Sequence, residues 1–348
     1  MPPTTQPRTL YTRHEPAFRT QYAELVERSR QAGRLLPGTP GSLALRTGTG
    51  YGYWYRRYYA VAGRQSEDLV CKEGDEQALA TVRARMEFAE WSQQQLRAFR
   101  QLGFQVADKD AACVLVEAYN NGLVEAGLAM VGTLAFMSWL NELGARAVTA
   151  RTQDVDLARR QALKLASPLS FLEAMQATHL QLFPVPGLSP HCPSTSLKRP
   201  GKESLRVDML THGPELGQVV ELPELQWHAQ AVPHLDYLLH DLHSASVLAG
   251  GHCVPVNLPA PERLLWHKLY ASASRQRDPA KAEKDLLQAA TLIAILVESD
   301  DFHLAGSMTD VPDEVVQAAQ SRTPALRRLL KAHPQALDAV EEALADTS

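Results

Sequence analysis

The sequence has few cysteines and no long apolar run, and each shortage excludes a class of protein. Its four cysteines are scattered through 348 residues, with neither a CxxC pair nor the spacing of a zinc site. Such cysteines predict reduced thiols rather than a disulfide framework. The longest apolar run, Ala289–Val297, is too short to span a bilayer, and residues 1–8 lack the charged start and apolar core of a signal peptide. We therefore expect a cytoplasmic protein without a membrane segment.

The chain also lacks an excess of basic charge. Lys and Arg number 35 and Asp and Glu number 39, so the formal net charge is −4. A broad nucleic-acid surface is disfavoured by this balance, whereas a local basic groove stays open. The apolar share of 45% and the charged share of 21% are ordinary for a globular protein.

Several familiar catalytic motifs are missing. There is no GxSxG motif of a serine hydrolase, and the glycines of Gly48–Gly52 lack the strand–helix context of a dinucleotide fingerprint. His240 and His243 are three residues apart, as metal ligands on a helix can be, but no Cys or Glu partner follows at a known spacing. We interpret the histidines as surface or core residues.

What the chain does contain is three carboxylates on short segments in which apolar and charged residues alternate. Asp154 and Asp156 lie in TQDVDL (152–157), and Asp208 lies in LRVDML (205–210). Residues two apart on a strand face the same side, so Asp154 and Asp156 project together and need a cation between them. Mg²⁺, with Mn²⁺ as an alternative, prefers such oxygen ligands. If the Asp208 strand lies alongside, the three groups predict a two-metal site for phosphoryl displacement.

Simpler interpretations of these carboxylates stay open. Charged residues are common on exposed edge strands, which would also explain the Asp154 and Asp156 pair. Asp208 could instead form an ion pair with Arg206, two residues earlier on the same strand face.

A glycine stands between a short apolar strand and a helix. Leu128–Val131 predicts the strand, Leu134–Leu143 predicts the helix, and Gly132 and Thr133 lie between them. A glycine at such a turn lets backbone N–H groups approach a phosphate at the positive end of the helix, and the Thr133 hydroxyl could add a hydrogen bond. A tight turn without a ligand is the alternative.

An aromatic run marks the N-terminal part of the chain. Residues 43–72 predict a β-hairpin or small meander, which contains Tyr51–Tyr59. These rings could stack on bases, with Arg56 and Arg57 on phosphates, or they could pack against an adjacent helix.

The order of these pieces resembles the nucleotidyltransferase fold of the DNA polymerase β superfamily. Its usual pattern is an apolar residue, Gly, then Gly or Ser, followed by an Asp-apolar-Asp-apolar strand. Residues 131–133 and 154–157 match the two pieces, and Asp208 stands for the third carboxylate. The gap between Gly132 and Asp154 is long for this superfamily, so we expect extra helix or loop there. The resemblance implies an α+β fold with a polymerase β-like palm and a mixed sheet.

The C-terminal part extends the resemblance. The segments WHKLY (266–270) and KAEKDL (281–286) are similar to the helical half of bacterial nucleotidyltransferase-like proteins, which include the abortive-infection nucleotidyltransferase toxins. The segments 53–55, 131–136 and 152–156 together resemble one poorly characterised bacterial family of this superfamily. The likeness implies that Lys268 contacts nucleotide phosphates and that Lys284 and Asp285 support the site. From the local pattern alone, Lys268 would lie on a solvated helix face.

The resemblance also implies an activity. It would be transfer of NMP from an NTP to an acceptor hydroxyl on tRNA or another RNA, a protein or a small molecule. Asp154 and Asp156 would ligate both Mg²⁺ ions, and Asp208 would ligate the catalytic one and orient or deprotonate the acceptor. A catalytically inactive binding or regulatory protein and a toxin with a cognate antitoxin are the alternatives.

We predict three regions. They are an N-terminal helical and β-hairpin module at 1–109, a nucleotidyltransferase core at 110–258 and a C-terminal helical region at 259–348. Within the core, the segment 184–200 is rich in Pro, Ser and Gly, which predicts a loop or flap. The segment 235–258 predicts short strands around a Gly-Gly turn.

Overall fold

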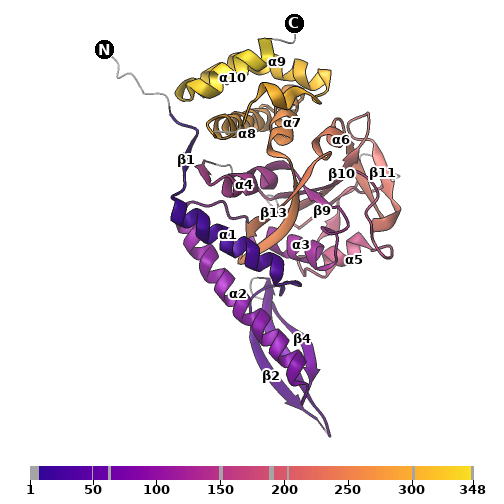
Figure 1. Cartoon of the computed structure of the whole chain (residues 1–348). Coiled ribbons are helices and arrows are strands. Elements are labelled where there is room, and N and C mark those ends of the chain that lie inside the picture. Colours follow the sequence, from indigo (N-terminus) through magenta and orange to yellow (C-terminus); the bar gives the residue numbers. More distant parts are fainter. Residues whose placement is uncertain are drawn as a thin grey trace.

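One mixed sheet forms the centre of the protein (Figure 1). The fold is described from a computed structural model, which defines residues 8–48, 50–61, 64–148, 152–187, 192–201, 204–299 and 302–345. In sheet order, the strands are β11 (Val219–Leu222), β12 (Trp227–Val232), β10 (Arg206–His212), β7 (Asp154–Arg159), β5 (Ala129–Met130), β14 (His252–Pro259) and β13 (Leu242–Ala249), with β9 (Ser196–Lys198) beside β10 and β8 (Phe183–Pro184) beside β9.

The sheet mixes strand directions. Strand β10 is parallel to both β7 and β12, and β14 is parallel to β5. The pairs β5–β7, β11–β12 and β13–β14 are antiparallel. This arrangement confirms the expected α+β fold with a mixed sheet.

Helices cover the sheet and extend beyond it. In chain order they are α1 (Pro16–Gln31), α2 (Glu76–Leu102), α3 (Lys109–Asn120), α4 (Gly132–Glu142), α5 (Phe171–Gln176), α6 (Leu235–Leu238), α7 (Pro261–Ser274), α8 (Pro279–Val297), α9 (Asp313–Leu329) and α10 (Pro334–Ala345). Short 3-10 turns lie at Pro223–Leu225, Ala305–Met308 and Leu330–Ala332. Helices α3 and α4 pack on strands of the sheet, and α4 also contacts α7. Among the described residues, no helix is both long and apolar enough to cross a membrane.

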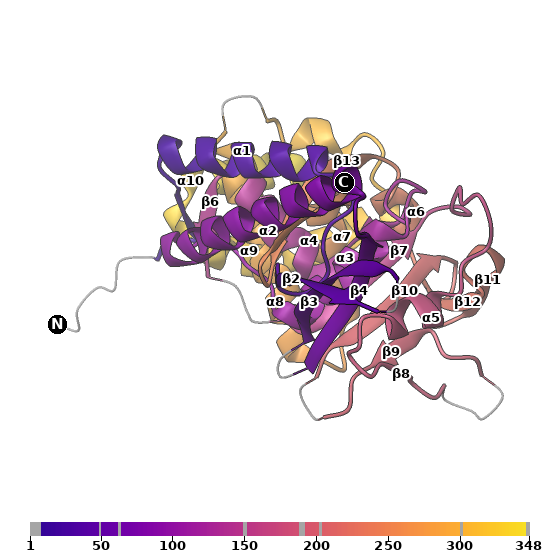
Figure 2. The ribbon, with the colours of Figure 1, turned by 90° about the horizontal axis from the view of Figure 1, so that it is seen from below.

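The two N-terminal helices lie side by side against the hairpin of β13 and β14 (Figure 2). A small second core joins them, in which Tyr22 and Leu25 of α1 meet Phe99 of α2 and Cys253 of β14. These helices are therefore packed on the central sheet, and the predicted boundary near residue 109 stays a prediction.

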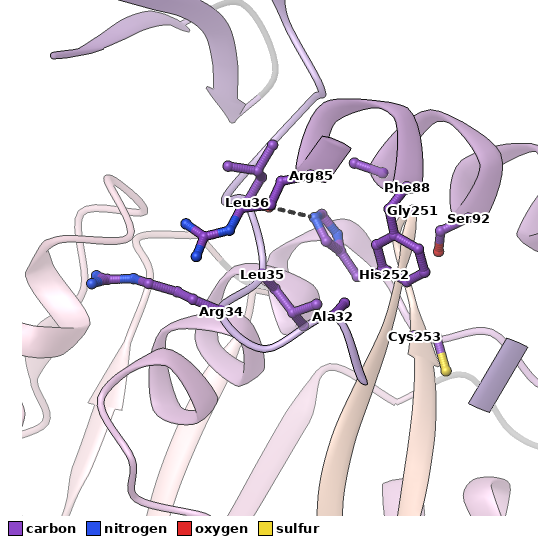
Figure 3. Close-up of a pocket in the computed structure, with 11 residues that line it drawn as sticks. Ala32, Arg34, Leu35, Leu36, Arg85, Phe88, Ser92, Gly251, His252 and Cys253 are labelled. Atoms are coloured by element: carbon purple, nitrogen blue, oxygen red, sulfur yellow. Dashed lines mark hydrogen bonds between the residues drawn. The ribbon is translucent and has the colours of Figure 1, made fainter. Parts of the chain in front are cut away.

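The turn between β13 and β14 packs closely against α2 and α3, and Figure 3 shows a small cavity beside it. Gly250 has a φ of +58°, and an added Cβ would lie 3.0 Å from the Cβ of Ala112. Burial lowers the pKa of His252, so its neutral ring can donate to the carbonyl of Leu36, with Nε2 and O 3.0 Å apart. The remaining cavity is about 20 Å³, which is room for a water rather than a ligand.

A strand module projects from the body beside α2 (Figure 1). We call it the arm, and it consists of the antiparallel strands β2 (Ser42–Thr47), β3 (Gly52–Val61) and β4 (Arg64–Lys72). Arg56 of β3 is only 1% exposed and donates to Asp68 Oδ2 at 3.1 Å and to the carbonyls of Pro37 and Thr39. Arg56 therefore belongs to the interior of the arm and is not available to a phosphate.

The C-terminal helices pack together and against the body (Figure 1). Helix α8 begins as its sequence predicts, because the Asp278 side chain accepts a hydrogen bond from Lys281 N at 3.1 Å and Pro279 occupies the first turn. The apolar stretch around Ile293 is fully buried. The boundary predicted at residue 259 stays a prediction.

The expectation was wrong in part of the core. The segment expected to be a loop at 184–200 contributes the strand β9, whose Leu197 pairs with Val207 of β10. The segment at 235–258 forms two long paired strands rather than several short ones. Strands β11 and β12 were not expected. The small sheet of β1 (Tyr11–Arg13) and β6 (Ala145–Ala147) was also not expected.

Candidate active site

Two predicted carboxylates are neighbours in the central sheet. Strands β7 and β10 are parallel and in register, with Asp156 paired to Asp208 and Asp154 paired to Arg206. Adjacent strands lie about 4.8 Å apart, and paired residues share one face. On the opposite face of β7, Val155 is fully buried. The alternation read in the sequence therefore places Asp154, Asp156 and Asp208 together, and β7 is not an edge strand.

The charge of this group is only partly balanced. Burial, together with the neighbouring carboxylates of Asp208 and Asp154, raises the pKa of Asp156 to about 7, against the opposing effect of Lys268 and Lys284. Without a ligand, negative charge at Asp156 is therefore unfavourable near neutral pH.

Asp208 is held by two groups of the protein. Arg206 Nε donates to Asp208 Oδ1 at 2.7 Å, and the hydroxyl of Ser196 donates to the same oxygen. Arg206 Nη2 also donates to Ser196 Oγ at 2.9 Å. The ion pair considered as an alternative is thus present. Among the described residues both bonds end on Oδ1, which leaves Oδ2 of Asp208 for a further ligand.

Gly132 lies directly against Asp156. Its φ is +69°, and an added Cβ would approach Asp156 Oδ2 well inside the 3.0 Å that real Cβ contacts keep. The preceding residue, Val131, donates its N–H to the carbonyl of Asp156 at 2.9 Å. The glycine therefore brings the N-terminus of α4 beside the carboxylates, where the positive end of the helix favours an anion.

Lys268 is a buried residue of α7 and not part of a solvated face. Its side chain is 5% exposed, and Nζ contacts Asp285 Oδ1 of α8 at 3.1 Å. Asp285 Oδ2 also lies 3.2 Å from Arg275 Nε. Burial lowers the pKa of Lys268, against the opposing effect of Asp285. The predicted residue Lys284 lies one position before Asp285, half-buried in the same cavity.

One cavity of about 530 Å³ joins these elements. All the residues predicted for the site line it: Gly132, Thr133, Asp154, Asp156, Asp208, Lys268, Lys284 and Asp285. Its other wall is largely apolar and includes Leu210 and Val232, together with the polar residues Gln230 and His267. Burial and the neighbouring Lys268 lower the pKa of His267 to about 4, so its ring is neutral at pH 7.

Some residues of the site were not predicted. Ser196, Gln230 and His267 escaped the sequence because they come from strands or helix faces whose partners are distant in the chain. Arg206 was noticed only as a partner of Asp208, and its bond to Ser196 could not be foreseen.

The carboxylates fit a hard divalent cation by their chemistry. Within the described part of the chain, no group of three or more His, Cys, Asp or Glu side chains is arranged to hold a metal ion as it stands. The donors are nevertheless all carboxylate oxygens on one face of neighbouring strands, and burial and the two neighbouring carboxylates make negative charge at Asp156 unfavourable, which raises its pKa. A divalent cation would supply it.

A comparison with protein families identifies the family of this chain. The model of a nucleotidyltransferase family matches residues 109–312. Members of such families generally use an NTP with divalent metal ions. The crystal structure of an antigenic nucleotidyltransferase-like protein from Paracoccidioides brasiliensis is similar at 15% identity and a TM-score of 0.36, over 67% of this chain and 91% of that one. No curated protein matches the chain.

Proposed function

Because the chain belongs to this nucleotidyltransferase family, we propose that it transfers NMP from an NTP to an acceptor hydroxyl and releases pyrophosphate. One observation carries the proposal. Two acidic strands, the N-terminus of a helix and a buried lysine, all far apart in sequence, line a single cavity of about 530 Å³.

The triphosphate would lie between α4 and α7. The N–H groups at Gly132 and Thr133 stand at the positive end of α4 and would bind the β- and γ-phosphates. Lys268 and Lys284 line the same cavity and would neutralise phosphate charge. Asp285 holds Lys268 in place at 3.1 Å and so would position it.

Asp154 and Asp156 would hold two Mg²⁺ ions, with Asp208 on the catalytic one. When bound, the ions would stabilise the attacking and leaving oxygens of the displacement. Asp208 Oδ2 would orient the acceptor hydroxyl and accept its proton. In the transfer, the hydroxyl oxygen forms a bond to the α-phosphorus, and the bond from the α-phosphorus to the bridging oxygen breaks. The bonding pair leaves with pyrophosphate.

The test is the transfer of labelled NMP in the presence of Mg²⁺ by the wild type, Asp156→Asn and Asp338→Asn. Asp338 is an exposed carboxylate of α10 and serves as the matched control. Loss of a residue that only supports a metal ligand lowers activity about 10–100-fold. We therefore expect at least that loss of NMP transfer in Asp156→Asn and no loss in Asp338→Asn. Full activity of Asp156→Asn would sink the assignment.

Calorimetry of NTP binding separates the alternatives. NTP binding that needs Mg²⁺ and Lys268, without transfer to any acceptor, would favour a binding or regulatory protein over an enzyme. Growth arrest on expression that is lost in Asp154→Ala would favour the toxin.

A further inference from the structure

A second cavity adjoins the candidate active site at Asp154. Its volume is about 600 Å³, and it shares Asp154 with the cavity described above. From Asp154 it extends past Thr152 to Lys109 at the start of α3 and to Arg199 after β9. A molecule in this cavity therefore reaches Asp154, which lies two residues from Asp156, the register partner of Asp208.

A third cavity continues the second toward the arm. Its volume is about 450 Å³, and it shares Arg100, Lys109 and Asp110 with the second. At its far end it is lined by Tyr59 of β3. The three cavities thus follow one another from the carboxylates to the base of the arm, which is more room than a small acceptor needs.

The third cavity carries unpaired positive charge. Arg97, Arg100 and Lys109 line it, and none of them forms an ion pair with another residue in the described part of the chain. Its one acidic lining residue among those described, Asp110, is already paired with Arg199. A net charge of −4 for the whole chain is therefore compatible with a local surface that attracts anions.

The arm continues this surface with aromatic rings. On β3 the even-numbered residues Arg56 and Tyr58 are buried, whereas Tyr53 and Tyr59 are 39% and 54% exposed. Tyr55 lies between them on the same face, with the guanidinium of Arg46 5.1 Å from its ring centroid. Along the arm Arg46 and Arg57 are paired with Glu67, so the unpaired cations lie beside Tyr59 only. Rings that continue from such cations suit a ligand that has both flat apolar groups and negative charge.

We propose that the acceptor is a single-stranded nucleic acid. This rests on the proposed function and names its acceptor. The terminal hydroxyl would lie at Asp208 and attack the α-phosphorus, with pyrophosphate as the leaving group and the proton passing to Asp208. The preceding phosphates lie along Arg97, Arg100 and Lys109, and the bases beyond them stack on Tyr59 and the other rings of the arm.

Binding is tested without NTP, by fluorescence anisotropy of short single-stranded RNA and DNA oligonucleotides. The variants are the double substitution Arg100→Glu with Lys109→Glu, and Tyr59→Ala. Arg328→Glu is the matched control, because Arg328 is exposed and unpaired among the described residues of α9, which lies at the opposite end of the molecule from the arm (Figure 1).

We expect the double variant and Tyr59→Ala each to bind at least about tenfold more weakly, since a stacked base or a phosphate contact is lost. Loss of two phosphate contacts should also reduce the slope of log affinity against log salt by about 1.4. The control should match the wild type, and all variants should bind NTP normally. Equal affinity of every variant and the wild type would overturn the proposal.

Transfer is tested with the same oligonucleotides, with a free or a phosphorylated 3′-hydroxyl. Labelled NMP on the free end only, of RNA, of DNA or of both, supports the proposal and identifies the sugar required. NMP on a protein while both oligonucleotides stay unlabelled overturns it and leaves the proposed function intact. If the wild type did not bind NTP, the proposed function itself would be wrong, whether or not the oligonucleotides bind.

Discussion

Charged side chains are in opposite states in two regions of the molecule. The first region is the cavity between β7 and α7, and the second is the pair of cavities beside the arm. Lys268 and Asp285 are buried and paired at 3.1 Å, whereas Arg97, Arg100 and Lys109 are exposed and have no ion-pair partner among the described residues. Buried charges are costly to remove from water and must keep their partners. Exposed charges cost little and attract ligands over a distance that salt controls. The first region is therefore suited to fixed geometry and the second to capture of a long anion.

The largest effect is expected from a substitution in the buried pair of Lys268 and Asp285. Lys268→Met leaves Asp285 with only Arg275 as a partner, so we expect it to lower the free energy of unfolding by about 3–5 kcal/mol and to abolish NTP binding. Urea unfolding and calorimetry measure the two effects.

A double variant isolates the role of the charge. Lys268→Met combined with Asp285→Leu should recover most of the stability, because no unpaired charge stays buried, but NTP binding should stay lost. If the double variant bound NTP as the wild type does, Lys268 would not be a phosphate ligand.

The next test uses pH. Asp156 has a pKa of about 7 in the folded protein, against 3.8 for an ordinary aspartic acid side chain. The folded state therefore binds this proton more tightly than the unfolded state, so stability falls as pH rises from about 4 to about 7 and then levels off. Asp156→Asn removes this loss, and we expect it to be the more stable protein at pH 8 by on the order of 3 kcal/mol.

Mg²⁺ should remove most of this difference in stability. Mg²⁺ at 100 times its dissociation constant would stabilise the wild type by about 2.7 kcal/mol, and Asp156→Asn much less. Thermal unfolding at pH 4 and pH 8, with and without Mg²⁺, measures both effects. If the stability of the wild type did not change between pH 4 and pH 8, the pKa of Asp156 would not be raised by burial and neighbouring carboxylates.

Alanine substitutions at two glycines separate the effect of backbone strain from the added effect of a close contact. Gly132 and Gly33 both have positive φ, but only at Gly132 would a Cβ meet another group, the carboxylate of Asp156, since nothing lies within 4 Å at Gly33. Alanine at Gly33 should cost about 1 kcal/mol from backbone strain. Alanine at Gly132 should cost about 2–3 kcal/mol, because it adds the displacement of Asp156, and should greatly reduce NMP transfer. Equal effects on transfer would show that the close approach of Gly132 has no role.

The carboxylate strands were predictable because their signal is local. Alternation of Val155 and Leu157 with acidic residues fixes which way Asp154 and Asp156 face, and nothing distant is needed to see it. The turn at Gly132 and the helix cap at Asp278 could also be predicted, since both depend on neighbouring residues, whereas a role of Gly132 in binding did not follow from the turn.

Other parts depend on contacts that a local pattern does not contain. Lys268 looked solvated because its partner, Asp285, lies 17 residues away on another helix. Ser196 lies in a segment whose composition is typical of a loop, and only its pairing with β10 makes that segment a strand. The packing of α1 and α2 on β14 is likewise a tertiary property. Local patterns thus predicted the carboxylates, Gly132 and Thr133, and the family resemblance implied Lys268, Lys284 and Asp285. The burial and partners of these residues required the fold.

The smallest expected effect is on stability in the cavities beside the arm. Arg100→Gln removes an exposed, unpaired charge, so the free energy of unfolding should change by no more than about 0.5 kcal/mol, in contrast to Lys268→Met. If oligonucleotides bind there, the same substitution should still reduce the salt dependence of their binding by about 0.7 in slope. Urea unfolding and anisotropy at several salt concentrations test the two statements separately. A loss of stability comparable to that of Lys268→Met would mean that Arg100 supports the fold, and the contrast between the two regions would fail at this residue.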